Sequence, residues 1–205
     1  MAVRIDGVTN RAGAAELDLR GGHPAVDFVN TVTWRGDPTR RSDHLVDFAS
    51  LVGWAWHADL MSSIERRAVH AAGMSDERAA RRVLRRAHHL REALHALWTS
   101  DSSDTSAVVD EYRAALRNRT LRIAGDRVRW VDQALIVDTP VNRIAIAAVA
   151  LLDTVALPVV KECGDAACGW LFVDNSHQRS RRWCSSADCG NRARARRHYD
   201  HRRSR

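Results

Sequence analysis

Apolar positions recur at helical spacing over much of the first 160 residues. The clearest case predicts a long amphipathic helix over 75–98, whose apolar stripe consists of Val83, Leu84, Ala87, Leu90, Leu94, Leu97 and Trp98. Similar spacing predicts shorter helices over 24–34, 44–56, 62–72 and 107–116. Pro24 lies near the first turn of the first of these, and Asp43 is the predicted N-cap of the second.

After residue 118 the period changes to two. The runs RTLRIA, DRVRWV and QALIVD predict a small antiparallel β-meander with turns at 125–126 and 132–133. Pro140 then opens a predicted helix over 141–157, which Pro158 closes. Its apolar run, 144–152, is much shorter than the roughly 20 residues that span a bilayer, so a buried helix is expected. The prediction is an α+β body, mostly helical, over 21–158, after a flexible N-terminus at 1–20.

Charge separates the end of the chain from this body. The net charge is +7, but the 30 residues from Ser176 onward hold ten arginines and only two acids, Asp188 and Asp200. The rest of the chain is therefore close to neutral. A neutral body with a basic tail is typical of a protein with a nucleic-acid-binding arm, or of one with an arm that lies on a membrane surface.

All four cysteines fall in the same final fifth. Cys163 and Cys168 have four residues between them, as have Cys184 and Cys189, and fifteen residues separate the two pairs. Two disulfides, a metal site and four unrelated thiols are the alternatives. The N-terminus has no apolar segment typical of a secretion signal, so we expect a cytoplasmic protein, in which thiols stay reduced. Composition agrees, because 45% hydrophobic residues over 205 positions can form a core without disulfides.

Two short cysteine loops supply the four soft ligands that Zn²⁺ prefers. We therefore predict one structural zinc ion held by all four cysteines, with no open position for hydrolytic chemistry. Between the pairs, 170–173 and 181–184 are predicted strands around a turn, and a helix follows Gly190. The order of knuckle, hairpin, knuckle and helix is that of a treble-clef module, and without metal it is expected to unfold.

The predicted terminal helix is charged on all sides, so it cannot pack tightly into a core. Guanidinium groups suit phosphates and guanine edges, and double-stranded DNA is the expected partner. The candidate DNA contacts are Arg179, Arg181, Arg182, Arg192, Arg194, Arg196, Arg197 and Arg203.

Two other functions stay open. RNA or ribosome-associated binding would use Trp183 and Tyr199 to stack on bases. A treble-clef nuclease would need a second metal on His177, His198 or His201, but no Asp-His or His-His pair ends the first strand. A non-enzymatic protein is therefore the prediction.

Polar residues also recur on the first predicted helix, where Asp27, Asn30, Thr31 and Trp34 would share one face. Asp27, Asn30 and Trp34 are candidates for a pocket that binds a small-molecule effector. The favoured alternative is structural, with Asp27 and Asn30 capping or tethering neighbouring loops.

Several motifs resemble a known family. The sequence CGNR at 189–192, preceded by LFVD at 171–174 and RRWC at 181–184 and followed by RRHY at 196–199, resembles the CGNR zinc-finger family. VDFVNT at 26–31 resembles a motif near the start of the ABATE domain that precedes this finger. His177-Gln178 departs from the basic or turn-forming residues more usual there.

The resemblance implies a bacterial, stress-induced transcription regulator. Its finger, 159–205, would bind DNA, and its ABATE-like domain, 21–158, would sense a ligand or mediate assembly. The DNA target, the effector and the oligomeric state stay open. A palindromic operator would require a dimer.

Overall fold

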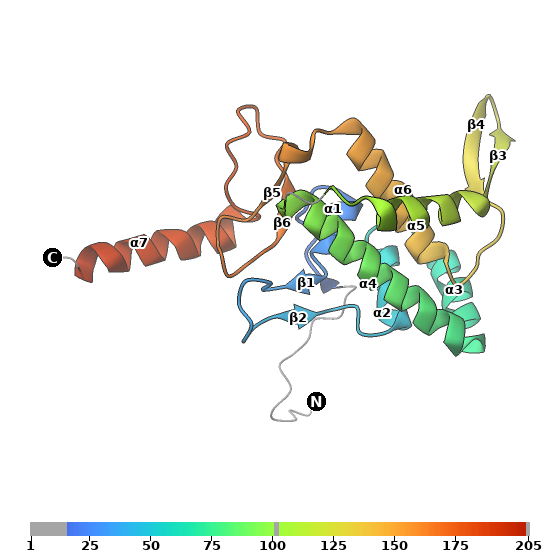
Figure 1. Ribbon diagram of the computed structural model, residues 1–205, viewed down its shortest axis with the longest axis horizontal. Helices are drawn as coiled ribbons and strands as arrows, with labels where there is room; N and C mark the ends of the chain where they lie inside the picture. Colours follow the sequence, from blue (N-terminus) through green and yellow to red (C-terminus); the bar gives the residue numbers. More distant parts are fainter. Residues whose placement is uncertain (1–15, 101–102, 204–205) are drawn as a thin grey trace.

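The computed structural model describes residues 16–100 and 103–203, most of them helical. The body, residues 16–158, contains the helices α1 (Pro24–Val29), α2 (Phe48–His57), α3 (Ser63–Ser75), α4 (Glu77–Thr99), α5 (Ser106–Arg117) and α6 (Thr139–Thr154). Its strands are β1 (Val32–Thr33), β2 (Ser42–Asp43), β3 (Arg119–Ala124) and β4 (Arg127–Asp132). The cysteine module, residues 159–203, follows a 3₁₀ turn at Leu157–Val159 and contains β5 (Val160–Glu162), β6 (Leu171–Val173), a π-turn at Ser186–Gly190 and α7 (Asn191–Arg203). Its β5–β6 pair lies beside α1 and α4, α7 extends away from the body, and the β3–β4 hairpin stands at the opposite end (Figure 1). The predicted flexible segment at 1–20 lies largely outside the described residues.

Helix α4 is the centre of the body and confirms the clearest sequence prediction. It packs against α1, α2, α3, α5 and α6. Most of its predicted stripe is buried, namely Val83, Ala87, Leu90, Leu94 and Leu97. Its N-cap is Asp76, whose side chain accepts a hydrogen bond from the Ala79 N–H at 2.8 Å. The helix therefore begins at Glu77, two residues after the predicted start at Ser75.

The predicted buried helix is α6, which ends at Thr154 and not at 157. Val141, Ile144, Ala145 and Ala148 are each at most 1% exposed. Within the described ranges, no helix has both the length and the apolar character needed to cross a membrane.

The helix predicted over 24–34 is wrong beyond Val29. Residues 32–33 instead form β1, antiparallel to β2. The β-branched run at 31–33 favours extended backbone, and Trp34 adopts a left-handed conformation with φ of 55°, which no helix accommodates. The shared polar face predicted for Asp27, Asn30 and Trp34 therefore does not exist.

Asp43 is likewise not a helix cap. Asp47 caps α2, forming reciprocal hydrogen bonds with Ser50. Asp43 lies in β2, where its two carboxylate oxygens accept from the buried Arg91 at 2.8 and 2.6 Å.

The predicted meander has two strands and not three. β3 and β4 form a hairpin whose turn contains Gly125, with φ of 65°. The run 133–138 forms no strand and instead connects the hairpin to α6. The Gln133 N–H and the Ala134 carbonyl bond Asn118 at the end of α5.

In the cysteine module the strand predicted at 170–173 is β6, but its partner is β5 and not 181–184. Residues 181–183 have no regular structure, because Arg181 bonds the carbonyls of Trp183 and Cys184 across its own segment. The hairpin therefore flanks the first cysteine pair.

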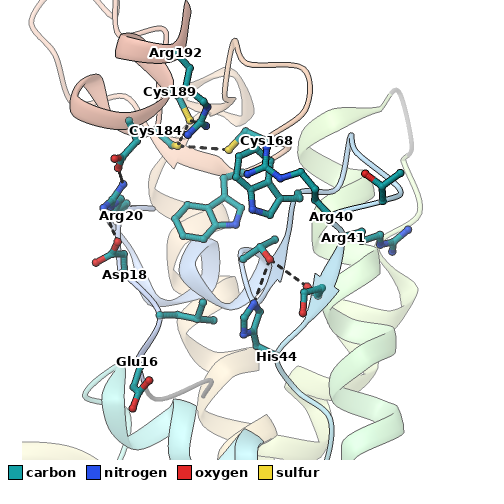
Figure 2. Close-up of a pocket in the computed structure, with 17 residues that line it drawn as sticks. Glu16, Asp18, Arg20, Arg40, Arg41, His44, Cys168, Cys184, Cys189 and Arg192 are labelled. Carbon is teal, nitrogen blue, oxygen red and sulfur yellow. Dashed lines mark hydrogen bonds and ion pairs between the residues drawn. The ribbon is translucent and has the colours of Figure 1, made fainter. Parts of the chain in front are cut away.

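The module is joined to the body along several contacts. Leu171 and Val173 of β6 belong to the main hydrophobic core, and the Val173 N–H donates to the Gly21 carbonyl at 2.8 Å. Arg20 of the body pairs with Asp188 in the second cysteine loop and with Asp18 (Figure 2). These contacts fix the module against the body.

Candidate metal centre and nucleic-acid interface

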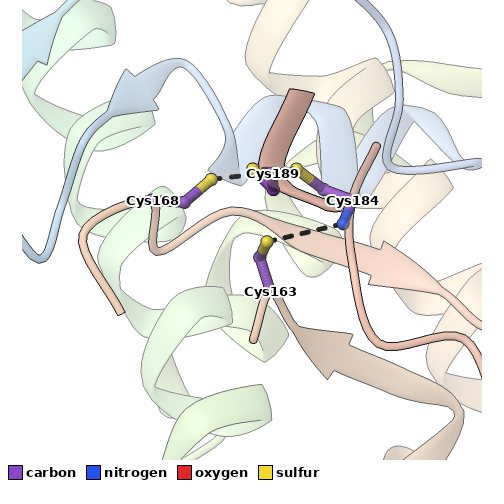
Figure 3. Close-up of side chains that lie close together, drawn as sticks. All are labelled: Cys163, Cys168, Cys184 and Cys189. Carbon is purple, nitrogen blue, oxygen red and sulfur yellow. Dashed lines mark hydrogen bonds between the residues drawn. The ribbon is translucent and has the colours of Figure 1, made fainter. Parts of the chain in front are cut away.

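The four cysteine sulfur atoms all lie within 4.8 Å of one another, and all four residues are buried (Figure 3). The Sγ atoms of Cys168 and Cys184 are 3.7 Å apart, and those of Cys184 and Cys189 are 3.5 Å apart. A tetrahedral zinc site with Zn–S bonds of about 2.3 Å requires sulfur–sulfur distances of about 3.8 Å. The spacing of the sulfurs thus fits a zinc ion.

Local turns bring each pair together. In the first loop, the Cys168 N–H donates to the Asp165 carbonyl at 2.7 Å, and the Cys163 N–H donates to the Trp170 carbonyl at 2.8 Å. In the second loop, the Ser185 hydroxyl accepts from the Asp188 N–H at 3.2 Å and opens the π-turn that carries Cys189. Two tight turns therefore aim four thiols at one point.

The chemistry of the thiols points to a cation. The pKa of the Cys184 thiol is raised far above its usual range, chiefly by hydrogen bonds with the Cys163 and Cys168 sulfurs and to a smaller extent by burial. Four thiolates cannot share so small a space without positive charge, and a divalent soft cation supplies it.

The second layer around the cysteines is built on Asp165, which is 1% exposed. Its carboxylate accepts from Arg192 Nε at 2.9 Å and from an Arg196 terminal nitrogen at 2.8 Å. Although burial opposes it, hydrogen bonds from Arg196 and Arg192 hold the pKa of Asp165 below its usual value. Arg192 also donates to Cys189 Sγ at 2.9 Å. Arg192 and Arg196 thus face their own module.

The other candidate DNA contacts have different surroundings. Arg181 is held by its carbonyl partners and lies 4.3 Å from the Phe172 ring centroid, and Arg182 lies 5.5 Å from that of Trp183. Arg194 donates to the Ser186 carbonyl at 3.1 Å and to Asn191.

The backbone carbonyl of Arg179 accepts from Lys161. Arg197 and Arg203 are exposed and take part in none of the ion pairs found among the described residues. The eight arginines therefore do not form one uniform surface.

The three candidate ligand residues have different surroundings. Asp27 is 6% exposed and accepts from the Gly21 N–H at 2.6 Å; burial raises its pKa to about 6. Asn30 is 2% exposed and bonds the backbone of Leu171. Trp34, in contrast, lines a cavity, with the Arg40 guanidinium 3.2 Å from its ring centroid.

Two known families match the chain. Residues 160–202 match the CGNR zinc finger, and residues 22–155 match ABATE, described as "Putative stress-induced transcription regulator". The chain belongs to the ABATE family. The two family matches confirm the resemblance that the sequence motifs indicated. No curated protein matches the chain. The body is thus the ABATE domain, and the cysteine module is the CGNR finger.

The cavity beside Trp34 lies where the ABATE domain meets the CGNR finger and has a volume of about 760 Å³ (Figure 2). Arg40, Arg41 and His44 line it from the ABATE domain, and Trp170 and Arg192 line it from the finger. Sequence reasoning treated 35–44 only as a loop and so missed these residues. The density of arginine around Trp34 was the available signal, whereas the approach of Trp170 requires the fold.

Proposed function

We propose that this protein is a zinc-dependent, DNA-binding transcription regulator of bacteria. In this proposal the CGNR finger binds duplex DNA in the cytoplasm, and the ABATE domain senses a ligand or a stress signal. The family description and the cysteine cluster support a regulator with a metal-binding finger.

The observation that carries the DNA-binding proposal is the two-sided arrangement of α7. Arg192 and Arg196 are turned toward Asp165. At 100° per residue, Arg194, Arg197 and His201 fall on the opposite side of the helix, away from Asp165, and all three are exposed. One side of α7 thus fixes the helix on the finger, and the other presents positive charge to a partner.

Duplex DNA is the partner that this helix fits. An α-helix with its side chains is about 10–12 Å across, and the major groove of B-DNA is about 12 Å wide. The major groove of A-form RNA is too narrow for side chains to read. Arg179 and Arg182, both exposed on the loop before Cys184, would add contacts to the phosphate backbone.

Zinc has a structural role in this proposal. Cys163, Cys168, Cys184 and Cys189 would hold one ion and leave no position for water or substrate. The ion would join the first loop to the start of α7, so that the helix keeps its orientation. The proposal assigns the protein no catalytic activity.

The test is the binding of zinc-loaded, full-length protein to labelled duplex DNA and to single-stranded RNA at two salt concentrations. The variant Arg194→Gln/Arg197→Gln should weaken duplex binding and reduce the slope of log K against log salt by about one to two units. The matched control, Arg78→Gln/Arg82→Gln, removes the same charge from the exposed side of α4.

An unchanged slope in the α7 variant, or an equal loss in the α4 control, would contradict this DNA interface. Preferred binding of RNA would favour an RNA-associated function instead.

A further inference from the structure

The cavity between the ABATE domain and the CGNR finger has the size and position of a ligand site. Its 760 Å³ lies within the range of about 300–1,000 Å³ that organic ligands occupy, and such sites are common where domains meet. Its walls come from segments 16–20 and 33–44 of the ABATE domain and from segment 168–192 of the finger, far along the chain. No single domain forms it alone.

Aromatic rings form part of its wall. Trp34 comes from the ABATE domain and Trp170 from the finger. Trp34 has a left-handed backbone at φ of 55°, a strained conformation for a bulky residue. Such strain persists where the surroundings require one particular orientation, and it gathers at binding sites. Here it places an indole at the boundary of the two domains.

The arginines that line the cavity differ in whether an acidic side chain pairs with them. Arg20 is paired with Asp18 and Asp188, and Arg192 is paired with Asp165.

Arg40 and Arg41 take part in none of the ion pairs within the described ranges, although both line the cavity. The guanidinium of Arg40 lies over the Trp34 ring, 3.2 Å from its centroid, so the indole holds this cation in place in the cavity wall. Thr39 and Ser42 add hydroxyl groups to the same wall.

We propose that this cavity binds a small aromatic anion. Its ring would lie beside Trp170, and its carboxylate or phosphate group would bind Arg41 and the Arg40 guanidinium that lies over Trp34. Guanidinium groups bind both kinds of anion through paired hydrogen bonds.

The cavity also touches the metal centre. Cys168, Cys184 and Cys189 line it, and Arg192 lies 4.8 Å from the Trp34 ring centroid while donating to Cys189 Sγ. A bound anion would therefore contact both domains and favour one orientation of the finger on the ABATE domain. This consequence rests on the proposed DNA-binding function, whereas ligand binding itself does not.

The test uses full-length, zinc-loaded protein labelled with 5-fluorotryptophan, whose seven tryptophans give ¹⁹F signals. Trp34→Phe and Trp170→Phe assign the two cavity signals. The probes are salicylate and phenyl phosphate, with neutral salicylamide and non-aromatic cyclohexanecarboxylate as matched controls. At least one aromatic anion should shift the Trp34 and Trp170 signals saturably, at least tenfold more tightly than either control. Whichever of salicylate and phenyl phosphate binds more tightly shows whether the cavity prefers a carboxylate or a phosphate group.

Arg40→Gln/Arg41→Gln should weaken this binding at least tenfold, and Arg78→Gln/Arg82→Gln should leave it unchanged. Equal binding of salicylamide, failure of both aromatic anions, or no effect of the Arg40 and Arg41 changes would overturn the site. DNA binding without anion binding would leave the proposed function intact and reject only the cavity. Anion binding that leaves DNA affinity unchanged would reject the coupling between the two.

Discussion

The side chain of Asn30 is hydrogen-bonded to both backbone groups of Leu171, 141 positions later in the chain. Its Nδ2 donates to the Leu171 carbonyl at 2.9 Å, and its Oδ1 accepts from the Leu171 N–H at 2.8 Å. Asn30 thus replaces a neighbouring strand on the free edge of β6. Both residues are at most 2% exposed, so water does not compete for these bonds.

Asn30→Ala should therefore weaken the attachment of the CGNR finger. It leaves a buried N–H and a buried carbonyl without partners, each at a cost of about 1–3 kcal/mol. We expect the free energy of unfolding, measured in urea, to fall by about 2–4 kcal/mol. Asn175→Ala removes an exposed asparagine from the same finger and is the control. Equal stabilities of the two variants would show that the paired hydrogen bonds contribute little.

Zinc removal should unfold the finger before the ABATE domain. Few apolar side chains surround the cysteines, namely Phe172, Trp170 and Trp183, so we expect a bound zinc ion to provide much of the finger's stability. In Cys184→Ser, or after chelation of the wild type, hydrogen exchange should lose protection in α7 but keep it in α4 and α6. Restored zinc should recover α7 in the chelated wild type only. Persistent protection of α7 without metal would contradict a structural zinc.

The sequence predicted most reliably those features that depend on local spacing. The stripe of α4 follows from 3.6-residue periodicity, and the clustering of the four cysteines follows from two equal short loops. Both patterns are dictated by geometry within a few residues, so they need no knowledge of the fold.

The features that the sequence did not predict depend on distant partners. Asp43 resembles a helix cap, but the buried guanidinium of Arg91 determines its role. The Arg192 side of α7 resembles a DNA-binding surface, but Asp165 occupies it. In each case a carboxylate and an arginine far apart in sequence pair only after the chain has folded.

Arg192→Gln should loosen the zinc site without unfolding the finger. Arg192 donates to Cys189 Sγ, and its hydrogen bond to Asp165 holds the guanidinium in that orientation. Loss of such a contact to a metal ligand typically changes metal affinity by about 10–100-fold. The rate of zinc transfer to a colorimetric chelator should accordingly rise about tenfold or more. Arg197→Gln, on the opposite side of α7, should keep the wild-type rate while weakening DNA binding. Equal transfer rates in both variants would argue against a role of Arg192 in holding the metal.

Asp27 makes stability depend on pH. Burial raises its pKa from 3.8 to about 6, so between these values the folded state binds more protons than the unfolded state. The favourable contribution of the protonated carboxyl is therefore present below pH 3.8 and is lost as the pH rises through about 6.

Asp27→Asn stays neutral and keeps an oxygen for the Gly21 N–H. Its stability relative to the wild type should therefore rise between pH 4 and pH 7, by up to about 3 kcal/mol. Urea unfolding at a series of pH values measures this difference, in which the pH dependence of zinc binding cancels. Asp126→Asn, whose wild-type side chain is 92% exposed, is the control and should show a flat difference. A flat difference for Asp27→Asn as well would mean that Asp27 is ionised in the folded protein at little cost.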